Sequence, residues 1–386
     1  MIKYKASLIL PFKVLVIFFF SFNVSFAKVI VGAENTSKYL KMIKDKNIGL
    51  VVNQSSLVNS QHLIEYLLSK KIKIKRLFAL EHGLRGKHDA GEEIRDGIDF
   101  KTNIPVASLY GKNKEPKEKD IIDLDIIIFD IQDIGVRFYT FISSMHYILN
   151  ACAEYNKTCI ILDRPNPNSN VVAGPVLEND QKSFLGMYPV PVVYGLTIGE
   201  LALMSKGEGW VNTSVDLKVI PIKNWQRHMK VKLEVKPSPN LPDDISISHY
   251  PSLALFEPTI VSIGRGTLNP FKFIGHPSLT DSGFSFTPLS IDGMSKNPKH
   301  RNKLCFGENL SNVKNEVFSI KYFIKYYNLL KNKNFMTYHK FFNKLIGNSN
   351  TFDKVKGGVH YKKIEESWTS KIEEYKKIRN KYLIYR

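Results

Sequence analysis

Ile74-Lys75-Arg76-Leu77-Phe78-Ala79-Leu80 runs directly into Glu81-His82-Gly83-Leu84-Arg85-Gly86-Lys87-His88-Asp89-Ala90-Gly91-Glu92. The first part is an apolar run of the length of a buried strand. The second part gathers acidic, imidazole and basic side chains between glycines, which predicts a loop. Open α/β sheets place their chemistry just beyond the carboxyl ends of parallel strands. We therefore expect a functional loop at the end of this strand.

Further apolar runs predict the other strands of a sheet. They cover residues 48–52, 105–109, 126–129, 158–162 and 217–220. Helical spacing of apolar residues fills the intervals, at residues 62–68, at residues 138–155, and from residue 196 onward. The last of these helices has the capping-box residues Thr197 and Glu200 at its start. This alternation predicts an α/β fold, with a parallel sheet covered by helices on both faces.

The pattern changes towards the C-terminus. Proline and glycine become frequent after residue 175, and the sequence is irregular and aromatic from about residue 250. It ends in two patterns that predict basic amphipathic helices, at residues 322–346 and 361–382. We therefore predict a large domain over residues 28–249 and a smaller α+β domain over residues 250–386.

The first 27 residues have the layout of a secretory signal peptide. Lys3, Lys5 and Lys13 precede or flank the start of the apolar run at residues 14–20, and Ser25-Phe26-Ala27 offers small residues for cleavage. An uncleaved anchor is the alternative, but the apolar run is short for a membrane span. We expect an exported protein, periplasmic or secreted, with no membrane anchor after cleavage.

The chain of 386 residues carries a formal net charge of +19 and 3 cysteines. A basic exported protein favours acidic glycans, anionic lipid headgroups or nucleic acid as partners. The lysines are scattered, and no basic stripe alternates with aromatic residues, so we do not expect nucleic acid to bind. An odd number of cysteines cannot pair completely within one chain, and Cys152 and Cys159 fall in core-forming patterns.

Polar clusters follow the apolar runs at several predicted strand ends. They are Glu81-His82-Gly83, Asp130-Ile131-Gln132-Asp133 and Asp163-Arg164-Pro165-Asn166. One acidic strand end is usually a turn or a helix cap. Clusters repeated along the same edge of a parallel sheet favour a ligand cleft there.

The acids of these clusters suit the two roles needed in glycoside hydrolysis. Glu81 follows apolar residues, and we expect this shielding to keep it protonated as a general acid. Asp130 and Asp163 adjoin polar and cationic residues, and we expect them to be ionised and to serve as the base or nucleophile.

Other polar residues near the clusters are candidates for substrate binding. Arg85, Arg137 and Arg164 are suited to holding a substrate carboxylate through paired hydrogen bonds. A sugar also needs fixed polar groups and an aromatic wall. The residues that offer these groups are Asn53, Gln132, Tyr139 and Asn166.

A metal site is an alternative use of the same residues. His82, His88, Asp89 and Asp130 carry suitable ligand atoms, but their spacing matches no zinc signature. No GxGxxG fingerprint follows the first strand, and no GxSxG elbow occurs. We predict no metal and no nucleotide cofactor, with a metal-dependent hydrolase as the alternative.

Several motifs together resemble those of one family. They are Val52-Asn53-Gln54-Ser55-Ser56, Glu81-His82-Gly83-Leu84-Arg85-Gly86, Asp89-Ala90-Gly91-Glu92, Asp130-Ile131-Gln132-Asp133-Ile134-Gly135-Val136-Arg137-Phe138-Tyr139-Thr140, Asp163-Arg164-Pro165-Asn166-Pro167, Gly264-Arg265-Gly266-Thr267 and Tyr382-Leu383-Ile384-Tyr385. In this order they are similar to the NamZ-type exo-β-N-acetylmuramidases, over essentially the whole chain after the predicted signal peptide.

This resemblance implies both a fold and an activity. The implied fold is a Rossmann-like domain with a smaller C-terminal domain, and the active-site cleft lies between them. The implied activity is that of an exo-acting glycoside hydrolase. Such an enzyme releases terminal N-acetylmuramic acid from the non-reducing end of peptidoglycan fragments or muropeptides.

The resemblance also implies site residues. Glu81 carries the glutamate of the family's EHG motif, and His82, Glu92 and Arg265 lie in the matched motifs as substrate contacts. An arginine is expected to recognise the lactyl carboxylate that distinguishes N-acetylmuramic acid from N-acetylglucosamine. The candidates in the matched motifs are Arg85, Arg137, Arg164 and Arg265, and of these we favour Arg85 and Arg137.

The competing class is an exported binding protein for glycans or muropeptides, without catalysis. Two α/β lobes around a cleft also describe solute receptors. Such receptors usually have two comparable lobes and need no shielded acid. The loop rich in acids and arginine, together with the unequal predicted domains, favours an enzyme.

Overall fold

The protein is described from a computed structural model. The structure describes residues 27–86, 89, 91–280, 283–313 and 317–386. Apart from Ala27, the predicted signal peptide lies outside the described residues, and so do Lys87, His88 and Ala90 of the glycine-rich loop. In the part of the chain that is described, no helix has both the length and the apolar character needed to cross a membrane.

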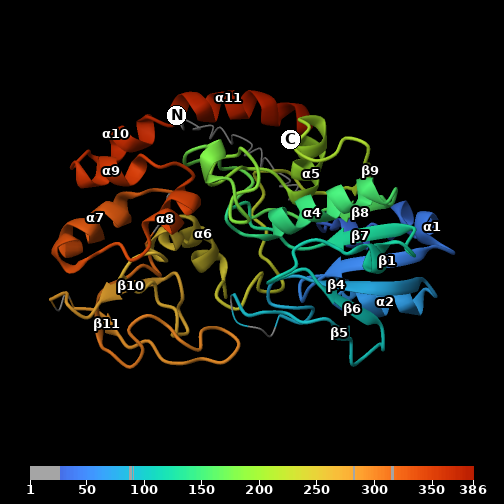
Figure 1. The fold of residues 1–386 in the computed structure, drawn as a ribbon, viewed down its shortest axis with the longest axis horizontal. Coiled ribbons are helices and arrows are strands. Elements are labelled where there is room, and N and C mark those ends of the chain that lie inside the picture. The colour runs from blue at the N-terminus through green and yellow to red at the C-terminus, as the bar shows by residue number, and fades with distance from the viewer. Residues whose placement is uncertain (1–26, 87–88, 90, 281–282, 314–316) are drawn as a thin grey trace, which may run out of the picture.

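A seven-stranded sheet forms the core of the larger domain (Figure 1). Its strands are β1 (Asn47–Val52), β4 (Lys73–Ala79), β5 (Gly97–Ile98), β6 (Pro105–Ser108), β7 (Ile126–Asp130), β8 (Thr158–Leu162) and β9 (Asp216–Ile220). Their order is β5-β6-β4-β1-β7-β8-β9, and all neighbours are parallel except β5 with β6. The predicted parallel sheet is confirmed, and the short edge strand β5 is an addition to it.

Helices cover both faces of the sheet (Figure 1). The helices of this domain are α1 (Leu40–Ile43), α2 (Leu63–Ser69), α3 (Glu118–Ile121), α4 (Phe141–Glu154) and α5 (Ile198–Gly207). Residues of α1 and α2 share an apolar cluster with Leu50 and Ile128, whereas residues of α4 and α5 share another with Val51 and Phe129. Because successive strand residues point to opposite faces, the two clusters lie on opposite sides of the sheet.

The start of α5 follows the capping box predicted from the sequence. The Thr197 hydroxyl accepts a hydrogen bond of 3.2 Å from the Glu200 amide, and Glu200 Oε2 accepts one of 2.9 Å from the Thr197 amide. These bonds satisfy amides that lack partners within the helix. The predicted helix start is confirmed.

The C-terminal part is smaller and mixes helices with a three-stranded antiparallel sheet. The sheet consists of β10 (Phe273–His276), β12 (Cys305–Asn309) and β11 (Ser285–Phe286), and a separate hairpin in the first domain consists of β2 (Leu57–Val58) and β3 (Gln61–His62). The helices are α6 (Asp244–Leu253), α7 (Lys321–Leu330), α8 (His339–Ile346), α9 (Thr351–Lys356), α10 (Tyr361–Glu366) and α11 (Thr369–Arg379). The boundary at residues 249–250 falls inside α6, which packs against α7.

The prediction of one helix over residues 322–346 is wrong. The chain leaves the helical conformation between α7 and α8, where Asn334 takes a left-handed conformation with φ of 54°. Phe335 then enters the core, and its carbonyl accepts a hydrogen bond of 3.0 Å from the amide of Ile260. Tertiary packing of Phe335 therefore overrides the helical pattern of the sequence. The predicted helix over residues 361–382 is likewise divided, into α10 and α11.

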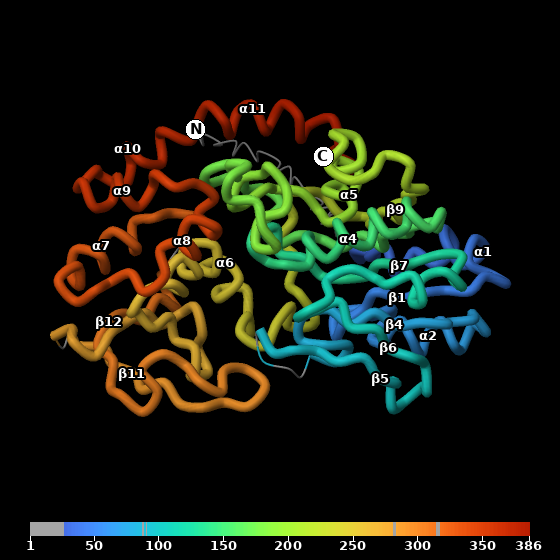
Figure 2. The backbone as a smooth tube through the Cα atoms, in the orientation of Figure 1, coloured from blue at the N-terminus to red at the C-terminus, as the bar shows by residue number. Residues whose placement is uncertain are grey.

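One apolar cluster joins the two parts of the molecule. It extends from Phe129 of β7 to Phe256 and Phe323 in the C-terminal part and to Tyr375 of α11. Figure 2 shows α11 running back from the C-terminal helices towards the first domain. The Tyr375 hydroxyl there donates a hydrogen bond of 2.7 Å to the Tyr194 carbonyl. The shared core thus sets the relative position of the walls of the cleft described next.

Candidate active site

A cavity of about 800 Å³ lies where the two parts of the chain meet. Glu81, Tyr110 and Thr140 contribute to its wall from the sheet domain, and Arg265 and Phe271 contribute from the C-terminal part. The cleft that we predicted between the domains is therefore present. Its wall combines acidic, basic and aromatic side chains, which suits a polar ligand with apolar faces.

Glu81 reaches the cavity through a tight turn after β4. The Leu80 carbonyl accepts a hydrogen bond of 2.9 Å from the Gly83 amide. His82 and Gly83 both take left-handed conformations, with φ of 68° and 73°. Glycine adopts such a conformation at little cost, which explains its place in the Glu-His-Gly sequence. The turn puts the Glu81 side chain on the cavity wall.

Both carboxyl oxygens of Glu81 are held by donors from other elements. The Tyr110 hydroxyl donates to Oε1 at 2.8 Å, and the Thr140 hydroxyl donates to Oε2 at 2.7 Å. The Gly91 amide adds a longer bond of 3.3 Å to Oε1. Burial, together with the contact to the Glu81 carboxyl group, raises the pKa of Tyr110, so the phenol keeps its proton near neutral pH. Glu81 is therefore fixed in one orientation at the cavity.

The loop after β7 supplies another part of the wall and ties the two domains together. Arg137 is fully buried and donates to the carbonyls of Pro175, Val190 and Leu345 at 2.8, 2.8 and 2.9 Å. Leu345 belongs to the last turn of α8, where a cation is favourable because unpaired carbonyls point outward. The residues directly after this anchor, 138–140, line the cavity.

Four aromatic side chains form a strip along the cavity wall. In this aromatic strip, defined as Phe138, Tyr139, Tyr250 and Phe271, the Tyr250 ring centroid lies 5.5 Å from Phe138, 6.1 Å from Tyr139 and 5.0 Å from Phe271. All three contacts are edge-to-face, a favourable arrangement for aromatic pairs. The strip runs from the sheet domain into the C-terminal part. Tyr250 is half-buried and faces the cavity, whereas Phe138, Tyr139 and Phe271 are buried and support it.

Arg265 and Glu257 form an ion pair on the same wall. Arg265 Nε lies 2.7 Å from Glu257 Oε1. Burial disfavours both charges, but the Arg265 and Lys299 cations outweigh burial and hold the pKa of Glu257 below its ordinary value. The Glu257 charge likewise outweighs burial at Arg265 and raises its pKa. Both groups are therefore charged near neutral pH.

Family comparison covers both parts of the molecule. Residues 48–245 match the family model described as "Exo-beta-N-acetylmuramidase NamZ, N-terminal". Residues 248–385 match the corresponding C-terminal model. The chain belongs to the NamZ family. The fold and the matched ranges agree with the family resemblance seen in the sequence motifs.

Individual NamZ relatives match over most of their length. The chain is 38% identical over 372 residues to the peptidoglycan beta-N-acetylmuramidase NamZ of Bacillus subtilis, covering 90% of this chain and 89% of the relative. Two crystal structures of DUF1343 family proteins from Bacteroides fragilis are also similar. Their TM-scores are 0.84 and 0.81 and their identities 40% and 25%, and each comparison covers 93% of this chain and 99% of the other.

Several of the predicted NamZ site residues meet at the cavity. Those on its wall are Glu81, His82, Glu92, Tyr139 and Arg265. Glu92 Oε2 accepts a hydrogen bond of 2.9 Å from the Asp89 amide, and Asp89 Oδ2 accepts one of 3.1 Å from the Lys296 amide of the C-terminal part. The loop after β4 therefore touches both sides of the cavity.

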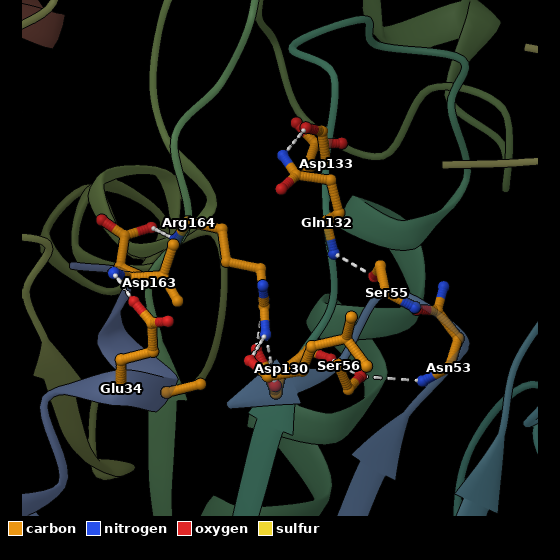
Figure 3. Close-up of polar contacts among 12 residues, drawn as sticks. Glu34, Asn53, Ser55, Ser56, Asp130, Gln132, Asp133, Asp163 and Arg164 are labelled. Atoms are coloured by element: carbon orange, nitrogen blue, oxygen red, sulfur yellow. Dashed lines mark hydrogen bonds and ion pairs between the residues drawn. The ribbon is translucent and has the colours of Figure 1, made fainter. Parts of the chain in front are cut away.

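Asp130 and Arg164 are placed differently from our expectation. Asp130 is fully buried, and Arg164 binds it through Nε at 2.5 Å and through Nη2 at 2.9 Å. Arg164 Nη2 also donates to the Leu57 carbonyl at 3.1 Å. This buried pair joins strand ends β7 and β8 (Figure 3). Neither residue lines the cavity that holds Glu81, so the predicted pairing of Asp130 with Glu81 in one cleft is not what the structure shows.

Asp163 is also away from the cavity. Its carboxylate accepts hydrogen bonds from Thr197 Oγ1 at 2.7 Å, from the Gly199 amide at 2.9 Å and from Tyr385 Oη at 2.7 Å. These partners place it at the start of α5 and connect it to the end of the chain. Burial raises the pKa of Asp163 to about 7, so our expectation of a firmly ionised base does not hold.

The predicted amide contacts hold the sheet edge together instead of facing the cavity. Asn53 Oδ1 accepts from the Ser55 amide at 2.9 Å, and Gln132 Nε2 donates to the Pro165 carbonyl at 2.7 Å. Asn166 Nδ2 donates to the carbonyl of residue 196 at 2.8 Å. These side chains close the loops between strands β1, β7 and β8. The clusters do share one sheet edge, as predicted. Most of their side chains, however, are buried and form hydrogen bonds within the protein, so they stabilise the fold and do not face the cavity.

Arg85 is engaged in the sheet domain as well. Its Nη1 lies 3.1 Å from Glu65 Oε1, and its Nη2 lies 3.3 Å from Asp99 Oδ1. Arg137 is held by backbone carbonyls. Neither of the two arginines that we expected at the lactyl carboxylate lies on the cavity wall. Because Arg85 is paired with carboxylates and Arg137 is bonded to backbone carbonyls, both arginines stabilise the fold.

A smaller cavity of about 250 Å³ lies at the carboxyl edge of the sheet, beside β1, β7 and β8. Gln132 and Arg164 line it together with Ser55, Glu34 and the segment 231–235. In a doubly wound sheet the common ligand position lies at this edge, where the order in which successive strands join the sheet reverses, here between β1 and β7. In this chain the larger cavity with Glu81 lies to one side of that position, between the two domains.

Sequence reasoning missed some residues of the main cavity. Tyr110 follows the short strand β6, which lies beside β4 in the sheet. The neighbouring positions of these two strands were the one sequence signal that could have placed Tyr110 near Glu81. Tyr250, Glu257, Ser238 and Asn240 come from the connection and the C-terminal part, where no regular pattern points to the cavity. Their placement depends on how the two parts pack.

The alternative metal site is not formed by the residues that the structure describes. Among them, no group of three or more His, Cys, Asp or Glu side chains is arranged to hold a metal ion. Asp130 is separated from His82 and Asp89 by its burial with Arg164. His88 lies outside the described residues.

Proposed function

We propose that this protein is an exo-acting β-N-acetylmuramidase that releases terminal N-acetylmuramic acid from the non-reducing end of peptidoglycan-derived glycans. The observation that carries the proposal is the Glu81 carboxyl group, fixed at the wall of the interdomain cavity by Tyr110 and Thr140. Membership of the NamZ family and the relative from Bacillus subtilis support the substrate class.

Glu81 is the proton donor of the proposed reaction. Cleavage of a glycosidic bond requires a carboxyl group beside the bridging oxygen, which accepts the proton as the bond breaks. Hydrogen bonds from two different elements fix the orientation of this group before substrate arrives. General acid catalysis of this kind contributes roughly 10²- to 10⁴-fold to the rate.

In this proposal, the second catalytic group of the reaction is a carboxylate on the cavity wall. Asp130 and Asp163 are fully buried away from it, which removes the support for their catalytic roles. The other carboxylates on the described wall are Asp89, Glu92 and Glu257. Because Glu257 is committed to Arg265, the loop residues Asp89 and Glu92 are the ones to compare by substitution.

The remaining wall residues bind the sugar. The half-buried Tyr250 ring of the aromatic strip packs against the apolar face of the sugar, and Ser238 and Asn240 offer hydrogen bonds from the segment that connects the domains. A cavity lined by both domains has room for the end of a glycan chain, which fits an exo-acting enzyme.

The proposal includes export of the protein to the periplasm or the medium. It is supported by the sequence pattern of residues 1–27 and by the cell-wall substrate class of the family. Mass spectrometry of the protein recovered from cell fractions tests it. A mature chain that begins near Lys28 supports export, and an intact N-terminus on cytoplasmic protein contradicts it.

The activity is tested with purified protein and an N-acetylmuramyl disaccharide. We expect the wild-type protein to release N-acetylmuramic acid, which chromatography of the product detects. We expect Glu81→Gln to lose this release. Ligand-induced stabilisation of the wild-type protein without any turnover would instead support the non-catalytic binding protein.

A further inference from the structure

Arg265 is held on a loop whose conformation is strictly defined. Gly264 and Gly266 take left-handed conformations with φ of 78° and 79°. A Cβ atom at Gly264 would lie 2.6 Å from the Asn269 carbonyl oxygen, which no neighbour could relieve by a side-chain movement. The Thr267 hydroxyl closes the turn with a hydrogen bond of 2.7 Å to the Gly264 carbonyl. The two glycines therefore set the direction of the Arg265 side chain.

Contacts of Arg265 leave part of its guanidinium group available. Nε is paired with Glu257, and the guanidinium carbon lies 5.0 Å from the centroid of the Phe271 ring. Among the described residues, none accepts a hydrogen bond from Nη1 or Nη2. The side chain is 24% exposed and lines the cavity, so these donors are open to a ligand. A guanidinium edge of this kind matches the two oxygens of a carboxylate.

The local charge remains positive despite the ion pair. Lys299 Nζ donates to the carbonyls of Phe256 and Glu257, each at 2.7 Å, directly behind the pair. Burial lowers the pKa of Lys299 to about 8, so most of this group is protonated at neutral pH. The Arg265 and Lys299 cations outnumber the Glu257 anion, and the net charge favours an anionic group at the free edge of Arg265.

We propose that Arg265 forms a carboxylate subsite that binds the lactyl group of the terminal N-acetylmuramic acid residue. This inference rests on the proposed function and names the group by which the site distinguishes its sugar from N-acetylglucosamine. The lactyl ether and the anomeric carbon lie at different positions of the sugar ring. Arg265 and Glu81 correspondingly reach the cavity wall from different domains.

The other arginines considered for this role are already committed. Arg85 binds Glu65 and Asp99, Arg137 binds backbone carbonyls, and Arg164 binds Asp130. Removing any of them is expected to disturb the fold of the sheet domain. Arg265 combines an open guanidinium edge with a position on the cavity wall, which is what recognition of a substrate carboxylate requires.

The test compares ligands that differ only in the lactyl group. Binding of N-acetylmuramic acid, of its lactyl amide and of N-acetylglucosamine is measured by calorimetry on wild-type protein, Arg265→Gln and Arg265→Lys. The control is Arg301→Gln, which changes an exposed arginine of the same domain. We expect wild type to prefer the acid by about ten- to a hundredfold, as one charge-assisted contact allows.

Arg265→Gln is expected to remove that preference, Arg265→Lys to keep part of it, and Arg301→Gln to keep all of it. Full preference for the acid in folded Arg265→Gln overturns the proposal. If the variant does not fold, the wild-type comparison of acid with amide decides, and equal binding overturns it. Absence of disaccharide cleavage by wild type, with the acid preference intact, contradicts the proposed function while leaving this carboxylate subsite supported.

Discussion

The Thr140 hydroxyl donates a hydrogen bond of 2.7 Å to Glu81 Oε2, although the residues are 59 positions apart in the sequence. Thr140 precedes α4, and Glu81 follows β4. The Tyr110 hydroxyl donates a hydrogen bond to the other oxygen of the same carboxyl group. The proposed proton donor therefore depends on three loops of the sheet domain, and each contact gives a separate prediction.

Glu81→Gln is expected to reduce turnover of the disaccharide by at least about 10²-fold, since it removes the proposed proton donor but keeps the shape of the side chain. The amide still offers an oxygen to one of the two hydroxyls, so the melting temperature should change little. Product release measured by chromatography checks the rate. Exposed Glu93→Gln, on the same loop, is the matched control. A Glu81→Gln rate near that of wild type would remove Glu81 from the mechanism.

Thr140→Ala is expected to reduce kcat by about fivefold with little change in KM, because it removes one orienting hydrogen bond of roughly 1 kcal/mol from Glu81. Thr140 acts here as a positioning residue. Thr140→Ser restores the hydroxyl and should recover most of the rate. Steady-state kinetics on both variants test this. A lost rate that serine fails to recover would point to packing by the threonine methyl group instead.

Arg137→Met is expected to lower the free energy of unfolding by about 3 kcal/mol, because it leaves buried carbonyl groups without donors. Urea denaturation measures this loss, with Arg301→Met as the exposed control. The folded protein that remains should keep its preference for N-acetylmuramic acid. Unchanged stability combined with a lost preference would return Arg137 to the role expected from the sequence.

Asp163→Asn is expected to alter the pH dependence of stability. The folded-state pKa of Asp163 is raised to about 7 from an ordinary value of 3.8, so the folded protein holds this proton more tightly than the unfolded chain. The resulting stabilisation is complete below about pH 4 and is lost as the pH rises to about 7. The hydroxyls of Thr197 and Tyr385 can accept from the amide of asparagine in place of donating to Asp163 Oδ2.

Urea denaturation of both proteins between pH 4 and pH 7 measures the effect. The stability of Asp163→Asn relative to wild type should rise steadily over this range. The pKa of Asp133 is also raised by burial, to about 6, but that contribution is common to both proteins and cancels in the comparison. Parallel pH profiles would show that Asp163 does not titrate in this range.

Treatment with EDTA followed by dialysis is expected to leave the activity unchanged. The reason is the proposed carboxyl-group chemistry of Glu81 and the absence of a recognised ligand spacing in the sequence. The disaccharide assay before and after treatment checks it. Loss of activity that a divalent ion restores would favour a metal site that includes His82 and His88.

Local sequence patterns predicted much of the sheet domain. Apolar runs located six of its seven sheet strands, and the Thr197 capping box located the start of α5. These signals depend only on residues that are close in the sequence, so they can be recognised without the tertiary structure. The helix break at Asn334 was missed because it depends on the packing of Phe335 against residues that are distant in the sequence. No local sequence pattern indicates such packing.

The sequence by itself determined the order of strands and helices, the placement of Glu81 in a loop after β4, and the family motifs that carry the resemblance. Tertiary structure decided which polar groups face the cavity. Asp163 bonds to Tyr385 across 222 residues, and Arg137 bonds to Leu345 across 208. Such long-range contacts bury some strand-end charges and leave Arg265 open. Because burial and hydrogen bonding set the role of a charged side chain, residue type and spacing alone did not separate the side chains that stabilise the fold from those of the site.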